Sequence, residues 1–462
     1  MGLKSVVVSK KKIELEDRFE PEFWVIGDFL NKVFKQYNWK KLDSYSESIK
    51  KGIFDLKANR YQRKGIPFLR ISNLKYFELG TEDLVYISEE DHKANKKTIL
   101  RQGDIAFSKI GTLGKIVRIG KRFPEVNISQ NIIGVRLKEN VNKNYIFAYL
   151  LSKIALLQIK KNRKKQLQDK LNLDDIRNIV VMELPSEYIR KISKLVEKAE
   201  EKSEKALNLI QQAQQILYQR LGIDFSKIKK ENVYSVNLLE FKDADLWTPK
   251  YSYPLYVNTL KAIGQKWQTV KIGEIATVKK GDEVGSENYN SYLDKKDSDV
   301  PFIRTSDLVN YEVDQFPDFY IPKEIYEELN QDIQTGDVLF TKDGKIGMTA
   351  MITESDKVII ASGLSRLRLK NEAKKYNLTP EYLFLVLSLK ETGLYPALRR
   401  TVTASTIPHL REERLKEIEI PILNKESINE ITKLVKEAFK LKDEKKKIIQ
   451  EVRKEIDDYF EI

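Results

Sequence analysis

Two stretches of the chain place apolar and small residues at alternating spacings of three and four, the pattern of a coiled-coil helix. The first starts at Ile189 and the second, 239 positions later, at Ile428. The first seam is Ile189, Ile192, Val196, Ala199, Ser203, Ala206, Ile210, Ala213 and Leu217, and the second is Ile428, Ile431, Val435, Ala438, Lys442, Lys445, Ile449, Val452 and Ile456. Because a lone amphipathic helix is marginally stable in water, we expect two long helices that pair antiparallel.

The two seams differ in the middle, where an antiparallel pair places one against the other. The first seam is small there, around Ser203, whereas the second offers Lys442 and Lys445. Two interpretations stay open for these lysines. They extend along the small residues to solvent, or they face DNA or a partner protein.

The segments between these helices also repeat each other. Q-G-D-I-A-F-S-K-I-G-T-L-G-K at 102–115 recurs as T-G-D-V-L-F-T-K-D-G-K-I-G-M at 335–348, and I-P-F-L-R-I-S-N-L at 66–74 recurs as V-P-F-I-R-T-S-D-L at 300–308. Short β-rich runs alternate with helical pieces, which predicts a mixed α/β globule in each half, the two related by an approximate twofold axis. The expected domains are a first globule at 1–185, a central helix at 186–222, a second globule at 223–423 and a distal helix at 424–462.

The charge of the chain favours a polyanionic partner. It holds 82 Lys and Arg against 68 Asp and Glu, a net charge of +14, and nucleic acid is the first candidate for such a surface. A Lys-rich and Glu-rich surface of the kind found in heat-adapted proteins is the alternative.

Composition also limits the chemistry and the compartment. There is no cysteine, and only His92 and His409 could offer an imidazole, so Cys-ligated metal sites are excluded and we expect neither a metal nor a cofactor. The apolar run at 6–8 is too short for a signal peptide, and no 18-residue apolar stretch follows. We expect a cytoplasmic protein without a membrane anchor.

The sequence S-K-I-G-T-L-G-K at 108–115 invites comparison with a phosphate-binding loop. The spacing fails, because Gly111 and Gly114 are only three apart and Lys115 is followed by isoleucine. Closely spaced glycines more often mark a tight turn. We also find no N-P-P-[YF] or D-P-P-Y loop of a DNA methyltransferase and no acidic nuclease cluster, so the sequence predicts no catalytic activity.

The repeated motifs and the duplicated helices together resemble the DNA-sequence specificity subunit of type I restriction-modification systems. The motifs are P-F-[LI]-R-x-S-[ND]-L, G-D-[IV]-x-F with its G-x-x-G turn, and the E-[LI]-P exit into each long helix, and the resemblance runs from about Asp17 to Phe460. It implies two target recognition domains, each reading one half of an asymmetric, bipartite duplex DNA target. It also implies that the helices set the spacing and bind two methyltransferase subunits, and that restriction and translocase subunits join through the complex.

Repeated polar positions are the first candidates for DNA contact. Arg70 and Arg304 occupy matching places, and the repetition fits either a buried framework ion pair or a phosphate contact. Small residues in the glycine turn let the backbone approach a phosphate, and lysines flank it. The candidates in these two groups are Arg70, Ser72, Asn73, Arg304 and Ser306, and Lys109, Lys115, Lys342 and Lys345.

Positions that differ between the halves are better candidates for reading bases, since the two domains would read different sequences. The basic run at 160–168 occupies the place held in the second half by 399–406. The candidates for the groove are Arg163, Lys164, Gln166, Arg399, Arg400, Thr403 and Ser405. A merely solvated charged face is the alternative. The polar loops at 129–131 and 362–363 also match, and His409, with no evident partner, is expected to be structural.

Two other classes of function remain to be weighed against a DNA-recognition subunit. One is a stand-alone DNA-modifying or DNA-cleaving enzyme, against which the missing motifs argue. The other is a helical adaptor that assembles proteins without touching DNA.

Overall fold

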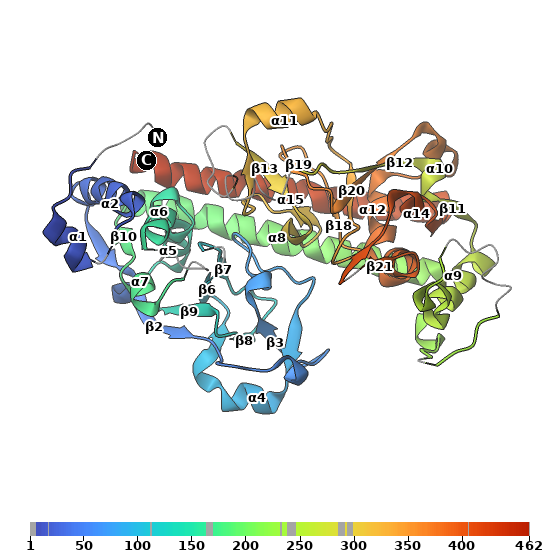
Figure 1. Ribbon diagram of the computed structural model, residues 1–462, viewed down its shortest axis with the longest axis horizontal. Helices are drawn as coiled ribbons and strands as arrows, with labels where there is room; N and C mark the ends of the chain where they lie inside the picture. Colours follow the sequence, from blue (N-terminus) through green and yellow to red (C-terminus); the bar gives the residue numbers. More distant parts are fainter. Residues whose placement is uncertain are drawn as a thin grey trace. The chain divides into compact units, whose positions relative to one another are not determined.

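The computed structural model describes residues 6–16, 18–110, 113–162, 170–231, 233–237, 246–284, 292, 299–404 and 406–461. The chain divides into two compact units, Met1–Glu201 with Lys447–Ile462, and Lys202–Lys446. Each unit combines an α/β globule with part of both long helices (Figure 1). The mixed α/β class and the two long helices predicted from the sequence are confirmed.

The first unit is built around two four-stranded sheets. Their strand orders are β2-β9-β6-β7 and β4-β3-β8-β5, and β1 pairs with β10. The strands are β1 (Trp39–Lys41), β2 (Ser46–Lys51), β3 (Ile66–Leu69), β4 (Val85–Ile87), β5 (Ile99–Arg101), β6 (Ile105–Ser108), β7 (Ile116–Arg118), β8 (Glu125–Ile128), β9 (Ile132–Leu137) and β10 (Val180–Met182). The helices are α1 (Lys10–Glu16), α2 (Pro21–Phe34), α3 (Leu42–Tyr45), α4 (Glu89–Ala94), α5 (Lys143–Leu150), α6 (Lys153–Asn162) and α7 (Leu173–Arg177).

The second unit repeats this plan. Its sheet β12-β20-β17-β18 has the same order as β2-β9-β6-β7, and β11 pairs with β23 as β1 does with β10. The strands are β11 (Thr269–Lys271), β12 (Ala276–Lys280), β13 (Val300–Ile303), β14 (Leu308–Val309), β15 (Glu312–Val313), β16 (Tyr320–Ile321), β17 (Val338–Thr341), β18 (Thr349–Met351), β19 (Ile359–Ile360), β20 (Leu364–Leu369), β21 (Val402–Ala404), β22 (Ile407–His409) and β23 (Glu419–Pro421). The helices are α9 (Pro254–Lys266), α10 (Ile272–Ile275), α11 (Lys323–Leu329), α12 (Pro380–Ser388), α13 (Tyr395–Arg399) and α14 (Glu412–Lys416).

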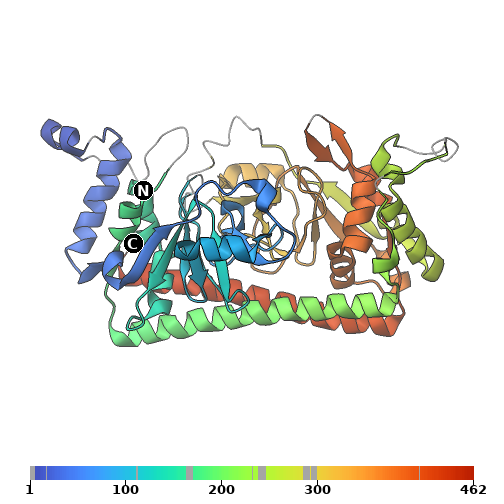
Figure 2. The ribbon, with the colours of Figure 1, turned by 90° about the horizontal axis from the view of Figure 1, so that it is seen from below.

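The long helices are α8 (Ser186–Leu221) and α15 (Lys425–Tyr459), which run side by side (Figure 2). They are antiparallel, because Lys191 of α8 pairs with Glu455 at 2.7 Å while Arg220, near the other end of α8, pairs with Glu430 at 3.0 Å. The predicted seam is largely buried, including Val196, Ala206, Ile210, Ile431 and Val435. Burial of this stripe gives each helix the stability that it would lack alone.

Both interpretations of the seam lysines were wrong. Lys442 and Lys445 are 0% and 3% exposed, so they neither reach solvent nor face a partner. Lys442 donates to the Asn310 carbonyl at 2.8 Å, and both ammonium groups pair with Glu312 of β15. A buried ammonium needs a counter-charge, and here the second globule supplies it.

The same network includes a third buried lysine. Lys446 pairs with Asp356 at 2.7 Å and lies 3.7 Å from Glu312. Burial alone would raise the pKa of Glu312, but Lys442, Lys445 and Lys446 together hold it well below its usual range. The network fastens the globule of the second unit to α15 through charge.

In the first unit the globule is fastened to the helices differently. Arg118 of β7 pairs with Glu200 of α8, and Asn144 donates to Glu197 at 2.7 Å. Arg453 of α15 lies 5.4 Å from the ring centroid of Tyr76. These polar contacts fix α5 and β7 on the long helices without a buried lysine cluster.

A strained turn recurs at the matching place in each globule. Phe77 and Tyr311 both have a left-handed backbone, with φ of 75° and 72°, a conformation that costs about 1–3 kcal/mol for a non-glycine residue. The centroid of each ring lies 5.6 Å from that of a phenylalanine on a later helix of the same unit, Phe147 of α5 or Phe384 of α12. The repeat of the strain and of its packing partner shows that this turn is a fixed part of the domain design.

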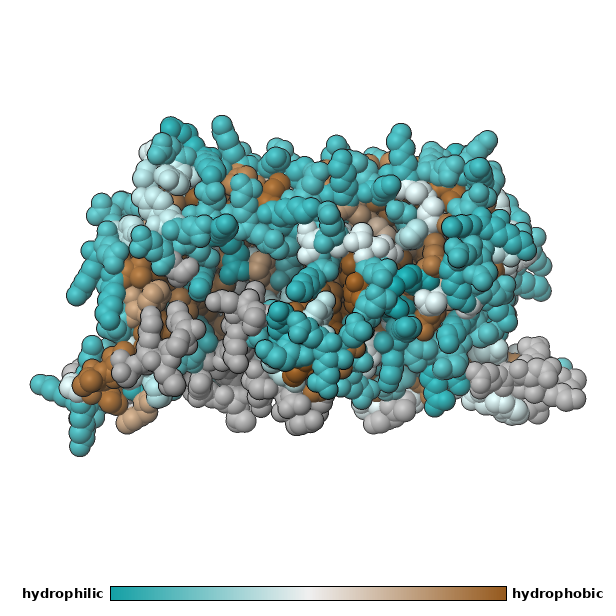
Figure 3. Space-filling view, turned by 90° about the horizontal axis from the view of Figure 1, so that it is seen from above, coloured by the Kyte–Doolittle hydropathy of each residue, from teal (hydrophilic) through white to brown (hydrophobic). Residues whose placement is uncertain are grey.

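Among the described residues, no helix is both long and apolar enough to cross a membrane. The face of the molecule in Figure 3 is dominated by hydrophilic side chains, with small hydrophobic areas between them. This distribution agrees with a charged-residue content of 32%.

Candidate nucleic-acid interface

Three segments that the sequence singled out separately meet in the first unit. We call them the glycine turn (108–115), the polar loop (129–131) and the basic loop (160–170). The Lys109 N–H donates to the Asn131 carbonyl at 2.9 Å, and the Lys109 carbonyl accepts from the Leu171 N–H at 2.9 Å. The turn therefore lies between the polar loop and the end of the basic loop.

The second unit builds the same junction with the same two bonds. The Lys342 N–H donates to the Gly363 carbonyl at 2.9 Å, and the Lys342 carbonyl accepts from the Leu410 N–H at 2.8 Å. Here the third segment is the β21–β22 hairpin (402–409). The two units thus share the same backbone hydrogen bonds at this junction but carry different side chains around it.

Backbone geometry sets both the glycine turn and its counterpart at 341–348 in the second unit. Gly114 and Gly347 have φ of 87° and 91°, and a Cβ on Gly347 would lie 2.5 Å from a Leu394 methyl. A hydroxyl closes each turn, since Ser108 accepts from the Lys115 N–H at 3.3 Å and Thr341 accepts from the Met348 N–H at 2.8 Å. The turn is structural, as the failed match to a nucleotide loop indicated.

The repeated arginines are held by acids of their own globule. Arg70 donates to the Asp83 carbonyl at 2.6 Å and lies 3.3 Å from its carboxylate. Arg304 pairs with Asp307 at 3.2 Å and Asp318 at 3.0 Å. These contacts favour the framework interpretation over a phosphate contact, and a DNA role for the pair stays a prediction.

The polar neighbours of these arginines differ in their exposure to solvent. Asn73 is fully buried and donates to the Gly80 carbonyl at 3.2 Å and to Asp83 at 3.0 Å. Ser72 and Ser306 are exposed beside them. Only the two serines present a hydroxyl at the surface.

The four lysines of the glycine turns have unequal surroundings. Lys342 is 9% exposed and pairs with Asp343 at 3.0 Å and Glu412 at 3.5 Å. Lys345 is exposed and Lys115 is half-buried. Lys109 is half-buried, and burial, followed by the charges of Lys51 and Lys170, lowers its pKa.

Of the groove candidates, Arg163, Lys164, Gln166 and Ser405 lie outside the described residues. Arg399 donates to the Tyr251 carbonyl at 2.8 Å and lies 4.3 Å from that ring, so it joins α13 to the segment at 249–252. Burial and the neighbouring Arg399 lower the pKa of Arg400. Thr403 is exposed on β21.

His409 has a partner that the sequence did not reveal. Its Nδ1 lies 2.9 Å from a carboxylate oxygen of Asp343. The pair joins β22 to the glycine turn, beside the bond from the Gly344 N–H to the Pro408 carbonyl at 2.9 Å. This contact fits the expectation of a structural histidine, which stays a prediction.

The family model of the type I restriction modification DNA specificity domain matches the chain twice, at residues 35–215 and 264–454. The chain belongs to this family. Its members are the non-catalytic specificity subunits of type I restriction-modification complexes, which sets aside the stand-alone enzyme and the adaptor that does not engage DNA.

Solved specificity subunits are similar to this chain over nearly its whole length. The type I restriction-modification S subunit from M. genitalium is 14% identical, with 92% of this chain and 95% of that chain covered and a TM-score of 0.33. The HsdS subunit from Thermoanaerobacter tengcongensis is 16% identical, with 92% and 96% covered and a TM-score of 0.30. No curated protein matches the chain.

This specificity subunit contains a second repeated ion pair that sequence reasoning missed. Arg136 on β9 donates to both carboxylate oxygens of Asp104, from Nε at 3.1 Å and from Nη2 at 2.6 Å, and Arg368 on β20 donates to both oxygens of Asp337, at 2.6 and 2.7 Å. Each aspartate also accepts a backbone N–H three residues earlier, at 2.8 Å. The repeated Gly-Asp motif therefore closes a turn and anchors an arginine of the central strand.

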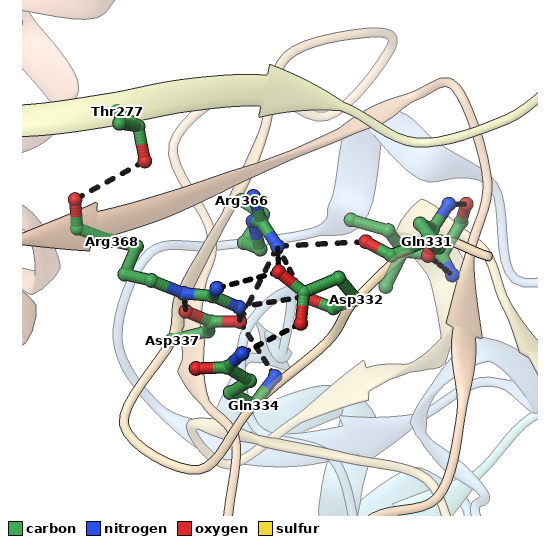
Figure 4. Close-up of polar contacts among 8 residues, drawn as sticks. Thr277, Gln331, Asp332, Gln334, Asp337, Arg366 and Arg368 are labelled. Atoms are coloured by element: carbon green, nitrogen blue, oxygen red, sulfur yellow. Dashed lines mark hydrogen bonds and ion pairs between the residues drawn. The ribbon is translucent and has the colours of Figure 1, made fainter.

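Figure 4 shows how this pair is extended in the second unit. Arg366 and Arg368 both point toward Asp332 and Asp337. Arg366 is 3% exposed and lies 3.6 Å from Asp332. The signal available in the sequence was the repeated R-L at 136–137 and 368–369, which follows the aspartate of each Gly-Asp by 32 and 31 positions. These arginines are framework residues and are not available to DNA.

Proposed function

We propose that this specificity subunit reads a bipartite duplex DNA target, with one half read by the globule at 1–185 and the other by the globule at 223–423. The helices at 186–222 and 424–462 set the spacing and dock two methyltransferase subunits. Family membership supports the DNA-choosing role. The division into half-sites is our inference.

The observation that carries this proposal is the duplicated junction around Lys109 and Lys342. Reading two different half-sites requires one supporting frame and two sets of side chains, because base edges are distinguished by donors, acceptors and methyl groups. The two units share the same pair of backbone hydrogen bonds at the junction. The third segment differs between them, since it is a Lys-rich and Gln-containing loop in one unit and a Thr-rich and Ser-rich hairpin in the other. Arg163, Lys164, Gln166, Thr403 and Ser405 are the proposed base-reading residues.

The test is selection from a random duplex library. The full chain is purified with its methyltransferase subunits, the complex is incubated with the library, and the retained DNA is sequenced. Two short motifs at a fixed gap are expected. Enrichment of a single uninterrupted motif, or of none while the complex remains intact, contradicts the proposal.

A further inference from the structure

The net positive charge of the specificity subunit comes from one of its two recognition domains. Residues 1–185 hold 37 Lys and Arg against 22 Asp and Glu, a net charge of +15. Residues 223–423 hold 28 against 31, a net charge of −3. The whole excess of the chain therefore belongs to the first domain, although both domains share one fold.

The junction of the first unit gathers three lysines. Lys51 ends β2, where the following Gly52 N–H donates to the Ile132 carbonyl at 3.2 Å, next to the polar loop. Lys109 bonds that loop at Asn131, and Lys170 lies opposite Ile110 in an antiparallel bridge. Three elements far apart in sequence thus bring three ammonium groups to one place.

The residues that the structure describes provide no counter-charge for these lysines. Among the described residues, none of Lys51, Lys109 and Lys170 forms an ion pair with an acid, and Lys51 and Lys170 are exposed. Burial lowers the pKa of Lys109, and the neighbouring charges of Lys51 and Lys170 lower it further. Mutual repulsion of this kind is relieved when an anion binds between the groups.

The matching positions of the second unit are all paired with acids. Lys280, which corresponds to Lys51, lies 3.8 Å from Glu283. Lys342, which corresponds to Lys109, pairs with Asp343 and Glu412. His409 stands where the first unit has Lys170, and it contacts the same Asp343. At two of these three positions an acidic partner is Asp343, which replaces Ile110 of the first unit.

We propose that Lys51, Lys109 and Lys170 bind phosphates of the DNA backbone, so that the first recognition domain supplies most of the salt-dependent affinity and the second reads its half-site with little electrostatic help. This proposal rests on the proposed function and names the residues and the domain that hold the duplex. Each phosphate neutralised releases counterions and adds about 0.9 to the slope of log affinity against log salt.

The test compares matched triple variants of the full chain in complex with its methyltransferase subunits. K51Q/K109Q/K170Q removes the cluster, and K93Q/K96Q/K97Q removes three exposed lysines on and after α4, with the same change in net charge. Binding of a labelled duplex is measured from about 0.05 to 0.3 M KCl. We expect the slope to fall by about 2 to 3 for the cluster variant and by less than about 1 for the control.

A second variant covers the case in which the triple variant does not fold. I110D introduces the acid that the second unit carries at the matching position, without removing a lysine. It is expected to lower the slope by about 1 to 2 while the thermal melting temperature stays within a few degrees of wild type.

The outcomes separate this proposal from the proposed function. If the wild-type complex selects two half-sites but the cluster variant and I110D keep the wild-type slope, the lysine site is wrong and the proposed function stands. If both triple variants lower the slope equally, the effect is one of net charge and the site is again wrong. If the wild type selects no sequence, the proposed function fails, and the slope on any duplex still decides whether the lysines bind phosphate.

Discussion

The buried lysine network on α15 provides a quantitative test of how the second globule is fastened. Replacing Glu312 with glutamine removes the carboxylate shared by Lys442, Lys445 and Lys446, all of which are at most 3% exposed. Lys446 keeps Asp356, whereas Lys442 and Lys445 lose the carboxylate with which both pair. Two buried ammonium groups then lose a shared counter-charge.

The expected loss is about 3–5 kcal/mol, the usual cost of breaking a buried ion pair by removing one partner. Replacement of the whole group, as E312L/K442M/K445M, removes the need for counter-charge and is expected to recover most of that loss. The pKa of Glu312 is held low, so its contribution is fully present above its unfolded pKa near 4.5 and is lost only as pH falls through the lower folded value. E312Q should therefore abolish this acid-dependent part of the stability.

Hydrogen exchange is the appropriate assay because a chain of two units need not unfold in one step. Amides of 438–448 and 308–315 are expected to exchange faster in E312Q at pH 7, with protection near wild type in the apolar triple variant. Wild-type exchange in E312Q would refute the reasoning, since the lysines would then be neutral or hydrated in the fold.

Two further predictions concern single positions. Burial raises the pKa of Asp457 to about 6, so the contribution of Asp457 to stability is greatest below pH 4 and falls by up to about 3 kcal/mol as pH rises through 6. D457N should remove this contribution in urea titrations between pH 4 and 7, and an unchanged pH profile would exclude it. G347A forces a Cβ to 2.5 Å from Leu394 at φ of 91°, and should lower the melting temperature by several degrees, whereas the exposed and unobstructed G120A serves as a control that should not.

The sequence was sufficient for features with a local period or a repeat. The three-four spacing predicted both helices, and the duplicated motifs predicted two α/β globules, because each pattern is contained in a continuous stretch of chain. It also placed the glycine turn, since a left-handed backbone is a property of the residue itself. The family assignment followed from the order of these elements.

Features that depend on contacts between distant segments were missed. Lysines on a helical seam usually reach solvent, and only the position of Glu312, 130 residues away from Lys442, shows that they do not. The Gly-Asp motif was recognised only as a repeat, and its arginine partners became visible only when β9 and β20 were paired with their neighbours. Lys51 was not singled out because its role depends on two other lysines.

The most direct test of the central claim is to repeat the library selection with two paired variants of the complex. R163A/K164A/Q166A changes the first domain, and T403A/S405A changes the second. The account predicts that each variant relaxes or alters one half-site motif, a different half in each case, while the other half and the gap are retained. Loss of the same half-site in both variants, or unchanged motifs in both, would contradict the assignment of one half-site to each domain.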